Sequence, residues 1–336
     1  MRKKQRSASS RSSNAHPRGN KRGHEDSRDT AKDRDAHREH SAERNAQRYG
    51  EQRSRPQRPD RSSQGLPCPK GAVMIWGRHA VGEALKNPNR KVISLYMASD
   101  MIDWLDEIRI ANNGLGHDAS GIKAPELIKM EKPALTAAMG ASLGHDEKAV
   151  HQGIVAIAHP LPHLVLQDWL EEINAGDQSS DAQSSDQRQV VMLLDQITDA
   201  RNVGAIMRSA RAFRATALIA PDRHCPDESG LMLRTASGAA EHIPLIRVVN
   251  LARAMEVLQD HGFILAGMAA QGNAPLSSLA DHDRLGIIMG AEGKGLRRLT
   301  KEHADLLVRI PIDDEAESLN VSNAAAVALY AAQRGE

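Results

Sequence analysis

The sequence predicts an α/β protein whose main part, residues 190–336, is a mostly parallel sheet covered by helices on both faces. Short apolar stretches alternate with helix-like segments throughout that region, and this alternation is typical of strand–helix–strand units. Three of the stretches run directly into polar loops marked by Gly or Asn. In an open α/β sheet such loops follow the carboxyl ends of strands, where ligands bind. The three junctions are therefore the first place to look for function.

The first 66 residues differ in composition from the rest of the chain. They hold 18 Lys and Arg against 9 Asp and Glu, which leaves 26 against 34 for residues 67–336. Their only aromatic residue is Tyr49, and aliphatic side chains larger than Ala are almost missing. Such a segment cannot bury enough apolar surface to offset the entropy of ordering, so a disordered basic arm is expected. Its arginines suit contacts with RNA phosphates, with a merely solubilising tail as the alternative.

A small α/β domain is predicted over residues 72–158. Its expected elements are strand 72–76, helix 79–86, strand 92–97, helix 101–112 and strand 153–158. A linker is predicted over 159–189. It contains a helical stretch at 164–173, followed by a run of Ser, Asp and Gln without large apolar side chains. That run is typical of a flexible connection.

From residue 190 onward the predicted strands and helices alternate. The expected strands lie near 190–194, 216–220, 263–268, 285–289 and 306–312. The expected helices lie near 202–214, 228–240, 250–261, 295–304 and 320–335. The three strands that lead into the polar loops are short and uniformly apolar. Each is therefore expected to be a buried parallel strand rather than a half-exposed edge.

The first junction continues from the strand at 190–195 into a helix that carries several arginines. Asn202 stands where an N-cap is expected, and Gly204 would let the backbone approach a ligand closely. The apolar helix face leaves Arg208 and Arg211 directed elsewhere. Because Arg208 follows a ligand-facing helix start, it is well placed to grip a phosphate. A solvated arginine on an exposed face is the alternative.

The second junction is the glycine-rich run Gly-Ala-Glu-Gly-Lys-Gly at 290–295. Its glycine order differs from the dinucleotide fingerprint, and no Ser or Thr follows the Gly-Lys pair as a magnesium-binding phosphate loop requires. A nicotinamide or nucleoside triphosphate site is therefore disfavoured, while an adenosine cradle made of backbone groups remains open. Glu292 has no evident core role within the run, and a plain surface charge is the alternative.

The third junction, Ser-Leu-Asn-Val-Ser-Asn at 318–323, places four short polar side chains at the start of an Ala-rich helix. Such side chains accept hydrogen bonds from free backbone donors and so cap helices. One of them would suffice for a cap. The surplus predicts a hydrogen-bonding site, with Leu319 covering an apolar ligand surface.

Composition narrows the remaining possibilities. No stretch has the length of a membrane span, and the N-terminus lacks a secretory signal. Cys68 and Cys225 are the only cysteines, and the histidines show no ligand-like spacing, so neither a disulfide framework nor a metal site is expected. We expect a cytoplasmic protein. With so few aromatic residues, recognition of RNA should depend on Arg, Lys and RNA shape rather than on base stacking.

Taken together, the three junctions closely resemble the motifs of the SpoU (TrmH-type) branch of the SPOUT-class RNA ribose 2′-O-methyltransferases. The resemblance covers residues 72–335. Within the family, the chain closely resembles the bacterial enzymes that methylate a guanosine in 23S rRNA. It implies a C-terminal SPOUT methyltransferase domain with a trefoil knot and S-adenosylmethionine (AdoMet) bound by the knot loops. It also implies a homodimer with sites at the interface and a leading RNA-binding domain that resembles a ribosomal-protein fold.

The resemblance also assigns roles to individual positions. The residues that match the catalytic motifs are Asn202, Arg208, Glu292, Ser318 and Asn320. Those that match the cofactor-lining positions are Gly290, Ile310 and Leu319. The family's proposed catalytic residue corresponds to Arg208, acting on the ribose 2′-hydroxyl. A guanidinium is a very poor base because its pKa exceeds about 12, so polarising the hydroxyl or gripping the adjacent phosphate is the favoured role.

Two positions depart from the family pattern. Arg211 and Arg214 stand where the family commonly has Asp and Gly, and this added charge either strengthens RNA contacts or indicates a different substrate. Three alternatives to 23S rRNA guanosine methylation stay open at this point. They are 2′-O-methylation of tRNA, a non-catalytic RNA-binding assembly factor and, more remotely, a nucleotide-dependent oxidoreductase.

Overall fold

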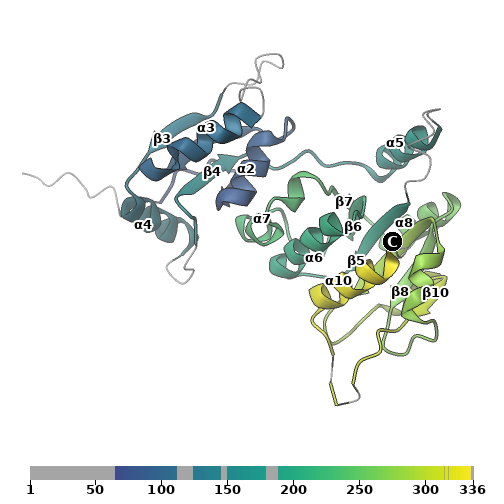
Figure 1. The fold of residues 1–336 in the computed structure, drawn as a ribbon. Coiled ribbons are helices and arrows are strands. Elements are labelled where there is room, and N and C mark those ends of the chain that lie inside the picture. The colour runs from purple at the N-terminus through teal and green to yellow at the C-terminus, as the bar shows by residue number, and fades with distance from the viewer. Residues whose placement is uncertain are drawn as a thin grey trace, which may run out of the picture. The chain divides into compact units, whose positions relative to one another are not determined.

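The computed structural model describes residues 65–111, 124–144, 150–178, 188–313, 315–316 and 318–333. These residues form two open sheets (Figure 1). Residues 1–64 of the predicted disordered arm lie outside the described residues. Leu66 was assigned to the arm but is buried, and its N–H donates to Ser142 Oγ at 2.7 Å. The folded part therefore begins slightly before the predicted boundary.

The first sheet has four strands in the order β1-β4-β2-β3. The strands are β1 Val73–Trp76, β2 Val92–Met97, β3 Glu126–Lys129 and β4 Ile154–Ala158. The accompanying helices are α2 Arg78–Lys86, the 3-10 turn η2 Ser99–Met101, α3 Ile102–Ala111 and α4 Lys132–Leu143. β4 runs antiparallel to β1 and β2, whereas β3 is parallel to β2.

The elements predicted for residues 72–158 are all present, but β3 and α4 were missed. β3 is a four-residue edge strand with mostly exposed side chains, so its sequence shows no clear alternation. α4 buries Leu135, Ala138 and Met139. Ala, Gly, Ser and Thr occupy most of its other positions, so the contrast between an apolar and a polar face on which pattern recognition depends is weak.

The helix predicted within the linker is α5, Leu166–Gln178. Its buried residues Leu166, Trp169 and Leu170 pack in the same core as the second sheet, and the Trp169 ring lies 6.2 Å from that of Phe263. α5 extends five residues beyond the predicted helical stretch, as far as Gln178. Residues 179–187 of the predicted linker lie outside the described residues.

The second sheet has six parallel strands in the order β10-β8-β9-β5-β6-β7. The strands are β5 Gln189–Asp195, β6 Ala217–Pro221, β7 Leu245–Val248, β8 Ile264–Met268, β9 Arg284–Gly290 and β10 Leu306–Val308. The α-helices are α6 Ala200–Ala212, α7 Gly230–Ala236, α8 Leu251–Asp260, α9 Arg298–His303 and α10 Val321–Ala332. Two 3-10 helices are η4 Ala239–Glu241 and η5 Leu276–Asp281.

The predicted parallel sheet is confirmed, with two corrections to its strands. β5 and β9 are central and almost wholly buried, as expected. β10 is an edge strand that ends at Val308 rather than at 312, and Pro311 just beyond it has no N–H with which to extend a ladder. β7 was missed because it is short and carries Arg247.

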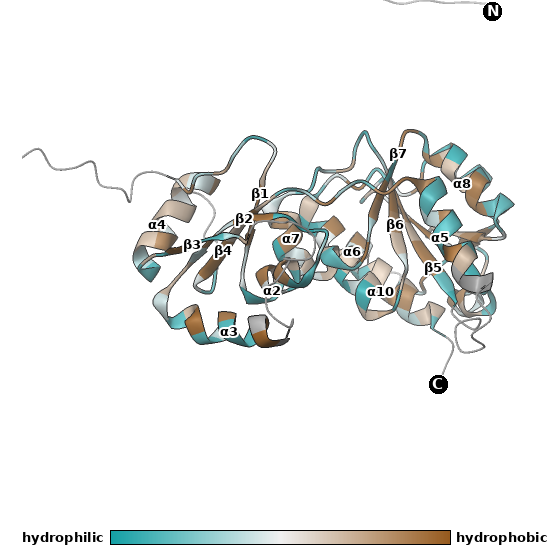
Figure 2. Ribbon diagram, turned by 90° about the horizontal axis from the view of Figure 1, so that it is seen from above, coloured by the Kyte–Doolittle hydropathy of each residue, from teal (hydrophilic) through white to brown (hydrophobic). Residues whose placement is uncertain are grey.

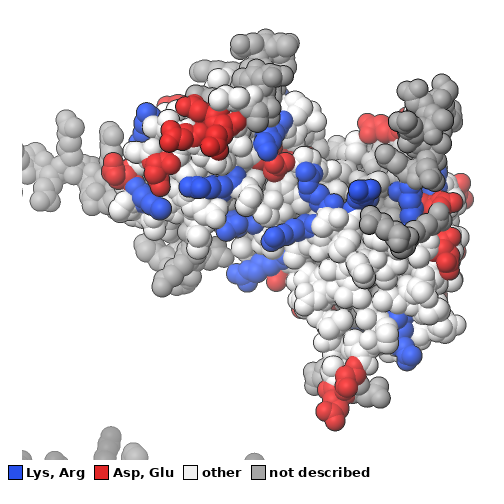
Figure 3. All heavy atoms as spheres, in the orientation of Figure 1, with Lys and Arg blue, Asp and Glu red and all other residues white. Residues whose placement is uncertain are grey.

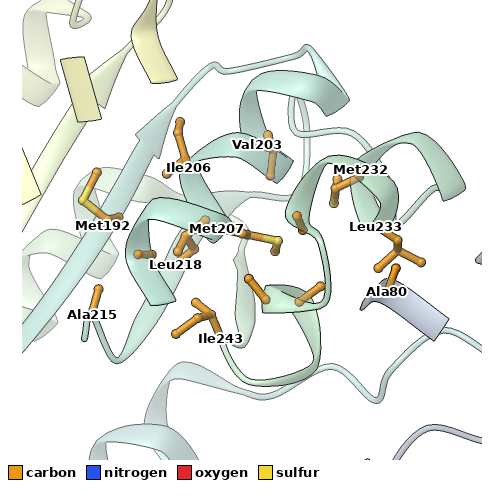
Figure 4. Close-up of a cluster of buried hydrophobic side chains, with 14 of the residues drawn as sticks. Ala80, Met192, Val203, Ile206, Met207, Ala215, Leu218, Met232, Leu233 and Ile243 are labelled. Carbon is orange, nitrogen blue, oxygen red and sulfur yellow. The ribbon is translucent and has the colours of Figure 1, made fainter. Parts of the chain in front are cut away.

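Helices cover both faces of the six-stranded sheet, as Figures 1 and 2 show for α6 and α10 on one side and α5 and α8 on the other. Alternate side chains of β5 point into two different cores. Met192 lies in the first core, with residues of α6 and α10, and Leu193 lies in the second core, with residues of α5 and α8. Figure 4 shows Val203, Ile206 and Met207 of α6 packing in the first core. None of the helices in the described part of the chain combines the length and the apolar character that crossing a bilayer requires.

Candidate active site

The first two junctions lie side by side because β5 and β9 are neighbouring parallel strands. Their register pairs Asp195 with Gly290, the last residue of each strand. The third junction reaches the same edge through α10, which packs against both α6 and β9 (Figure 1). Three segments that are far apart in sequence therefore converge at the carboxyl end of the central strands, where ligands bind in open α/β sheets.

One polar residue from each junction joins a hydrogen-bonded group, which we call the amide–carboxylate cluster: Asn202, Glu292 and Asn320. Glu292 Oε1 accepts from Asn202 Nδ2 at 3.0 Å and from Asn320 Nδ2 at 2.7 Å. Asn320 Nδ2 also lies 3.2 Å from Asn202 Oδ1. Hydrogen bonds to a carboxylate are among the stronger ones, so the cluster ties the three junctions together.

Asn320 takes part in the cluster while it also caps α10. Its Oδ1 accepts from the N–H of Ser322 at 2.9 Å and from Ser322 Oγ at 2.6 Å. The cap uses the amide oxygen and leaves the amide NH₂ group free to reach Glu292. Ser318 and Leu319 precede it and are exposed.

The start of α6 differs from the prediction in two ways. The N-cap is Asp199, whose carboxylate accepts from the N–H of Arg201 at 2.8 Å. Asn202 is instead the third residue of the helix, which leaves its side chain available to the cluster. Gly204 does not face a ligand, because a Cβ there would lie 2.5 Å from the carbonyl oxygen of Met232. The glycine admits the backbone of α7 against α6.

Arg208 lies further along α6 on its exposed face and outside the amide–carboxylate cluster. At about 100° per residue it stands roughly 120° around the helix from Asn202. Within the described part of the chain its guanidinium has neither a hydrogen-bond nor an ion-pair partner. All five of its donors are therefore available to a substrate.

The glycine-rich loop after β9 folds back on the end of its own strand. The N–H of Gly295 donates to the carbonyl of Ala291 at 2.8 Å, and φ is positive at both Gly293 (74°) and Gly295 (64°), where glycine is favoured. A Cβ on Gly290 would lie 2.3 Å from the carbonyl carbon of Gly295. This tight return places Glu292 at the tip of the loop.

Asp195, the last residue of β5, is a further candidate that the motifs did not single out. It is fully buried, and its carboxylate accepts from the backbone N–H of Arg297 at 2.9 Å and from Arg297 Nε at 2.5 Å. It thereby anchors the far end of the glycine-rich loop to β5. The available signal was an acidic residue that completes an otherwise apolar strand. Ile310 is half-buried in the segment that follows β10.

Comparison with known proteins identifies relatives of this region and of the longer chain. Residues 189–330 match the model of the SpoU rRNA Methylase family. The 23S rRNA (guanosine-2′-O-)-methyltransferase RlmB of Coxiella burnetii is 34% identical over 260 residues, covering 77% of this chain and 94% of that protein. Its Escherichia coli counterpart is 40% identical over 192 residues, covering 56% of this chain and 75% of that protein.

A third relative extends well beyond the region that this chain matches. An uncharacterized tRNA/rRNA methyltransferase of Synechocystis is 33% identical over 260 residues, and the match covers 76% of this chain but 61% of that protein. Among solved structures, the SpoU methyltransferase AviRb of Streptomyces viridochromogenes, in complex with the cofactor AdoMet, has a TM-score of 0.57 at 21% identity. That match covers 78% of this chain and 89% of that chain.

An AdoMet-bound rRNA methyltransferase of Sinorhizobium meliloti has the same TM-score of 0.57 at 20% identity, covering 78% of this chain and 87% of that chain. At these identities the structural likeness shows the fold alone. The sequence relatives carry the evidence for common descent.

Proposed function

Because the chain belongs to the SpoU rRNA methylase family, we propose that it transfers a methyl group from AdoMet to the ribose 2′-hydroxyl of a guanosine in 23S rRNA. The observation that carries this proposal is the meeting of Asn202, Glu292 and Asn320, one from each predicted motif, at the carboxyl edge of the sheet. A protein that only binds RNA has no need to hold these three loops together. Action on ribosomal RNA would place the enzyme in the cytoplasm.

The groups at this edge fit AdoMet. AdoMet carries no phosphate, so a loop of backbone groups beside short polar and apolar side chains suits it better than a basic cradle. Leu319 is 39% exposed and flanks the cluster, which offers an apolar surface next to hydrogen-bonding groups. The residues that would hold the cofactor are Gly290, Ile310 and Leu319.

AdoMet, when bound, supplies an electrophilic methyl group on a positively charged sulfur. The protein's task is to bring the 2′-oxygen to that methyl group in line with the bond that breaks. A guanidinium does not give up its proton in proteins, so Arg208 acts as a hydrogen-bond donor and not as a base. It would donate to the 2′-oxygen, or to the adjacent phosphate, while the hydroxyl proton passes to solvent water. The amide–carboxylate cluster keeps the loops in one arrangement throughout.

A trefoil knot is a further part of the proposal. β10 lies at the sheet edge, yet the chain after it returns to pack as α10 against α6 and η5. The connection from β8 to β9 pairs in parallel with the end of β10, since Ala274 donates to the carbonyl of Leu307 at 3.0 Å and accepts from the N–H of Arg309 at 3.3 Å. A C-terminal segment that threads beneath this connection accounts for these contacts.

We also propose that the enzyme is a homodimer with its sites at the interface. The outer face of α10 carries exposed apolar side chains, among them Val327 at 37% and Tyr330 at 70% exposure. A partner subunit would remove this apolar surface from water. Sedimentation analysis should find a dimer for the native chain and a monomer for Tyr330→Asp, and a monomeric native chain would contradict the proposal.

The leading part of the chain has a separate proposed role. Residues 72–158, with the basic arm before them, would bind the RNA and hold it near α6. Residues 67–336 carry more acidic than basic side chains, whereas the arm carries an excess of arginines. The arm is therefore the segment best suited to contact RNA phosphates. Binding through this region should weaken steeply with salt and show little sequence preference.

The decisive experiment uses labelled AdoMet and 23S rRNA from a strain that lacks the gene. The native protein should transfer one methyl group per rRNA, and mapping should place it on a guanosine 2′-oxygen. Arg208→Ala should lower the rate by about 100-fold or more without abolishing AdoMet binding. Transfer to tRNA alone would replace the proposed substrate, and no transfer to either RNA would overturn the proposed enzyme.

A further inference from the structure

The end of α6 holds an arginine in a backbone conformation that normally belongs to glycine. The N–H of Ala215 donates to the carbonyl of Ala210 at 2.8 Å, and Arg214 itself has φ 56°. These are the features of a Schellman helix end, in which the left-handed position is usually glycine because other side chains are strained there. A strained residue that persists on a surface is a reason to look for a function.

No local contact of the Arg214 side chain accounts for the strain. It is exposed, and within the described ranges its guanidinium has no hydrogen bond or ion pair. Packing does not require an arginine at this position either, because the side chain is exposed. Its charge is therefore free for a partner outside this chain.

Arg211 shares this situation. It is exposed, and its Nη2 atom lies 4.0 Å from Glu83 Oε2. That carboxylate already binds His242 Nε2 at 2.5 Å and Lys86 Nζ at 2.9 Å. Because Glu83 already has two closer partners, it neutralises the charge of Arg211 only weakly. An ion pair at 4 Å near water contributes little free energy.

The two arginines continue the face on which Arg208 lies. Arg208 and Arg211 are three residues apart, about 60° around the helix from each other, and Arg214 follows at its end. We call this surface the arginine face of α6. Figure 3 shows several Lys and Arg side chains over the region of α6 and α7, and the largest group of acidic side chains over the region of α3.

We propose that Arg211 and Arg214 bind the phosphates of the RNA strand next to the nucleotide that Arg208 handles. The inference rests on the proposed function and adds a site to it. Guanidinium groups match phosphate oxygens with two parallel hydrogen bonds. Contacts of this kind fix the position of the strand without reading its sequence. The strain at Arg214 is then the cost of placing a cation at that point.

The helix dipole offers a competing explanation. Cations near the last turn of a helix are stabilised by its unpaired carbonyl groups, and both arginines lie at that end of α6. If this were their whole role, Arg214→Gly would lose a favourable charge and RNA binding would not change. The two explanations therefore predict different results for the same variant.

The experiment compares Arg214→Gly with Ser237→Gly. Ser237 ends α7 with φ 51°, so its replacement by glycine relieves the same kind of strain without removing a charge. Thermal unfolding should rise by about 2–4 °C in both variants, as relief of backbone strain predicts. Only Arg214→Gly should weaken binding of an rRNA fragment, by several-fold at moderate salt.

The salt dependence of binding, measured without AdoMet, provides the sharper readout. Each lost phosphate contact should lower the slope of log K against log salt by about 0.7–0.9. Arg214→Gly and Arg211→Gln should each do so, and the double variant by about twice as much. Arg214→Lys should keep most of the slope. Equal slopes for Arg214→Gly, Ser237→Gly and the native protein would overturn the inference.

Failure of this site and failure of the proposed enzyme give different results. If the slopes fall as expected but no methyl group is transferred, the phosphate site stands and the proposed reaction does not. If methyl transfer proceeds while the slopes stay unchanged, the reaction stands and the arginine face is not a phosphate site.

Discussion

The polar side chains at the two ends of α6 differ in whether they have partners within the protein. At the first turn, Asn202 is bound to Glu292 and Asn320 in the amide–carboxylate cluster. At the other end, Arg211 and Arg214 project from the surface with almost no compensation. Groups that bind each other are already organised before a ligand arrives, whereas weakly paired cations respond to whichever anion comes near. If both proposals hold, one helix joins a preorganised cofactor edge to a surface that binds RNA phosphates.

The largest effect should come from placing a second carboxylate in the cluster. Asn320→Asp retains an N-cap oxygen for α10, because Asp caps as well as Asn. It also replaces the amide that donates to Glu292 at 2.7 Å with a like charge. We expect methyl transfer to fall by about 100-fold or more while the salt slope of RNA binding stays the same. Transfer rates and binding titrations on the same protein would test this.

Asn250 provides the matched control for that variant. It caps α8, with its Oδ1 accepting from the N–H of Ala252 at 2.9 Å, and it has no role in the site. Asn250→Asp should leave transfer unchanged. If Asn320→Asp were equally active, the cluster would be irrelevant to catalysis and the contrast between the two ends of α6 would disappear.

The next effect concerns how α6 is held in place. Gly204→Ala would put a methyl group 2.5 Å from the carbonyl oxygen of Met232. We expect unfolding free energy to fall by about 1–3 kcal/mol from overpacking, measured by urea denaturation. Gly140→Ala is the control, because a Cβ there meets nothing within 4 Å and should stabilise α4 slightly. A loss of AdoMet affinity without a loss of stability would mean that Gly204 faces the ligand after all.

Asp195 allows a test of the loop that carries Glu292. Asp195→Ala removes both hydrogen bonds to Arg297, and Arg297, which is 45% exposed, can turn its charge to water. The remaining consequence should be a looser glycine-rich loop and AdoMet affinity lower by about tenfold, roughly 1.4 kcal/mol. Calorimetric titration would measure this. Glu302→Ala, which breaks an exposed pair with Arg298, should leave the affinity unchanged.

Features of this site that depend on local sequence could be predicted, whereas features that depend on distant contacts could not. The buried strands β5 and β9 and the polar loops after them were predictable because periodicity and loop composition are local properties. The contact of Gly204 with α7 was not, because it depends on which segments meet in space. The N-cap of α6 was placed at Asn202 instead of Asp199 because Asn and Asp are both favoured at N-caps and composition alone does not choose between them. β10 was wrongly expected to be buried, since an apolar run of three or four residues does not reveal its neighbours.

The smallest effect should come from the acid that lies beside the arginine face. Burial alone raises the pKa of Glu83, but hydrogen bonds from His242 and Lys86 outweigh it and lower that pKa below its ordinary value of 4.5. The folded state therefore prefers the charged form. Its stabilising contribution is complete above the unfolded-state pKa and is lost as pH falls through the lower folded-state value.

Glu83→Gln should accordingly flatten the loss of thermal stability between about pH 5 and pH 3, by an amount kept small because Glu83 is partly exposed. The same change removes the only carboxylate paired with Arg211 among the described residues. RNA affinity should therefore rise by about two- to threefold at low salt and return to the native value at high salt. AdoMet affinity should not change. A change in AdoMet affinity of similar size would mean that the arginine face and the amide–carboxylate cluster are coupled through α6 rather than independent.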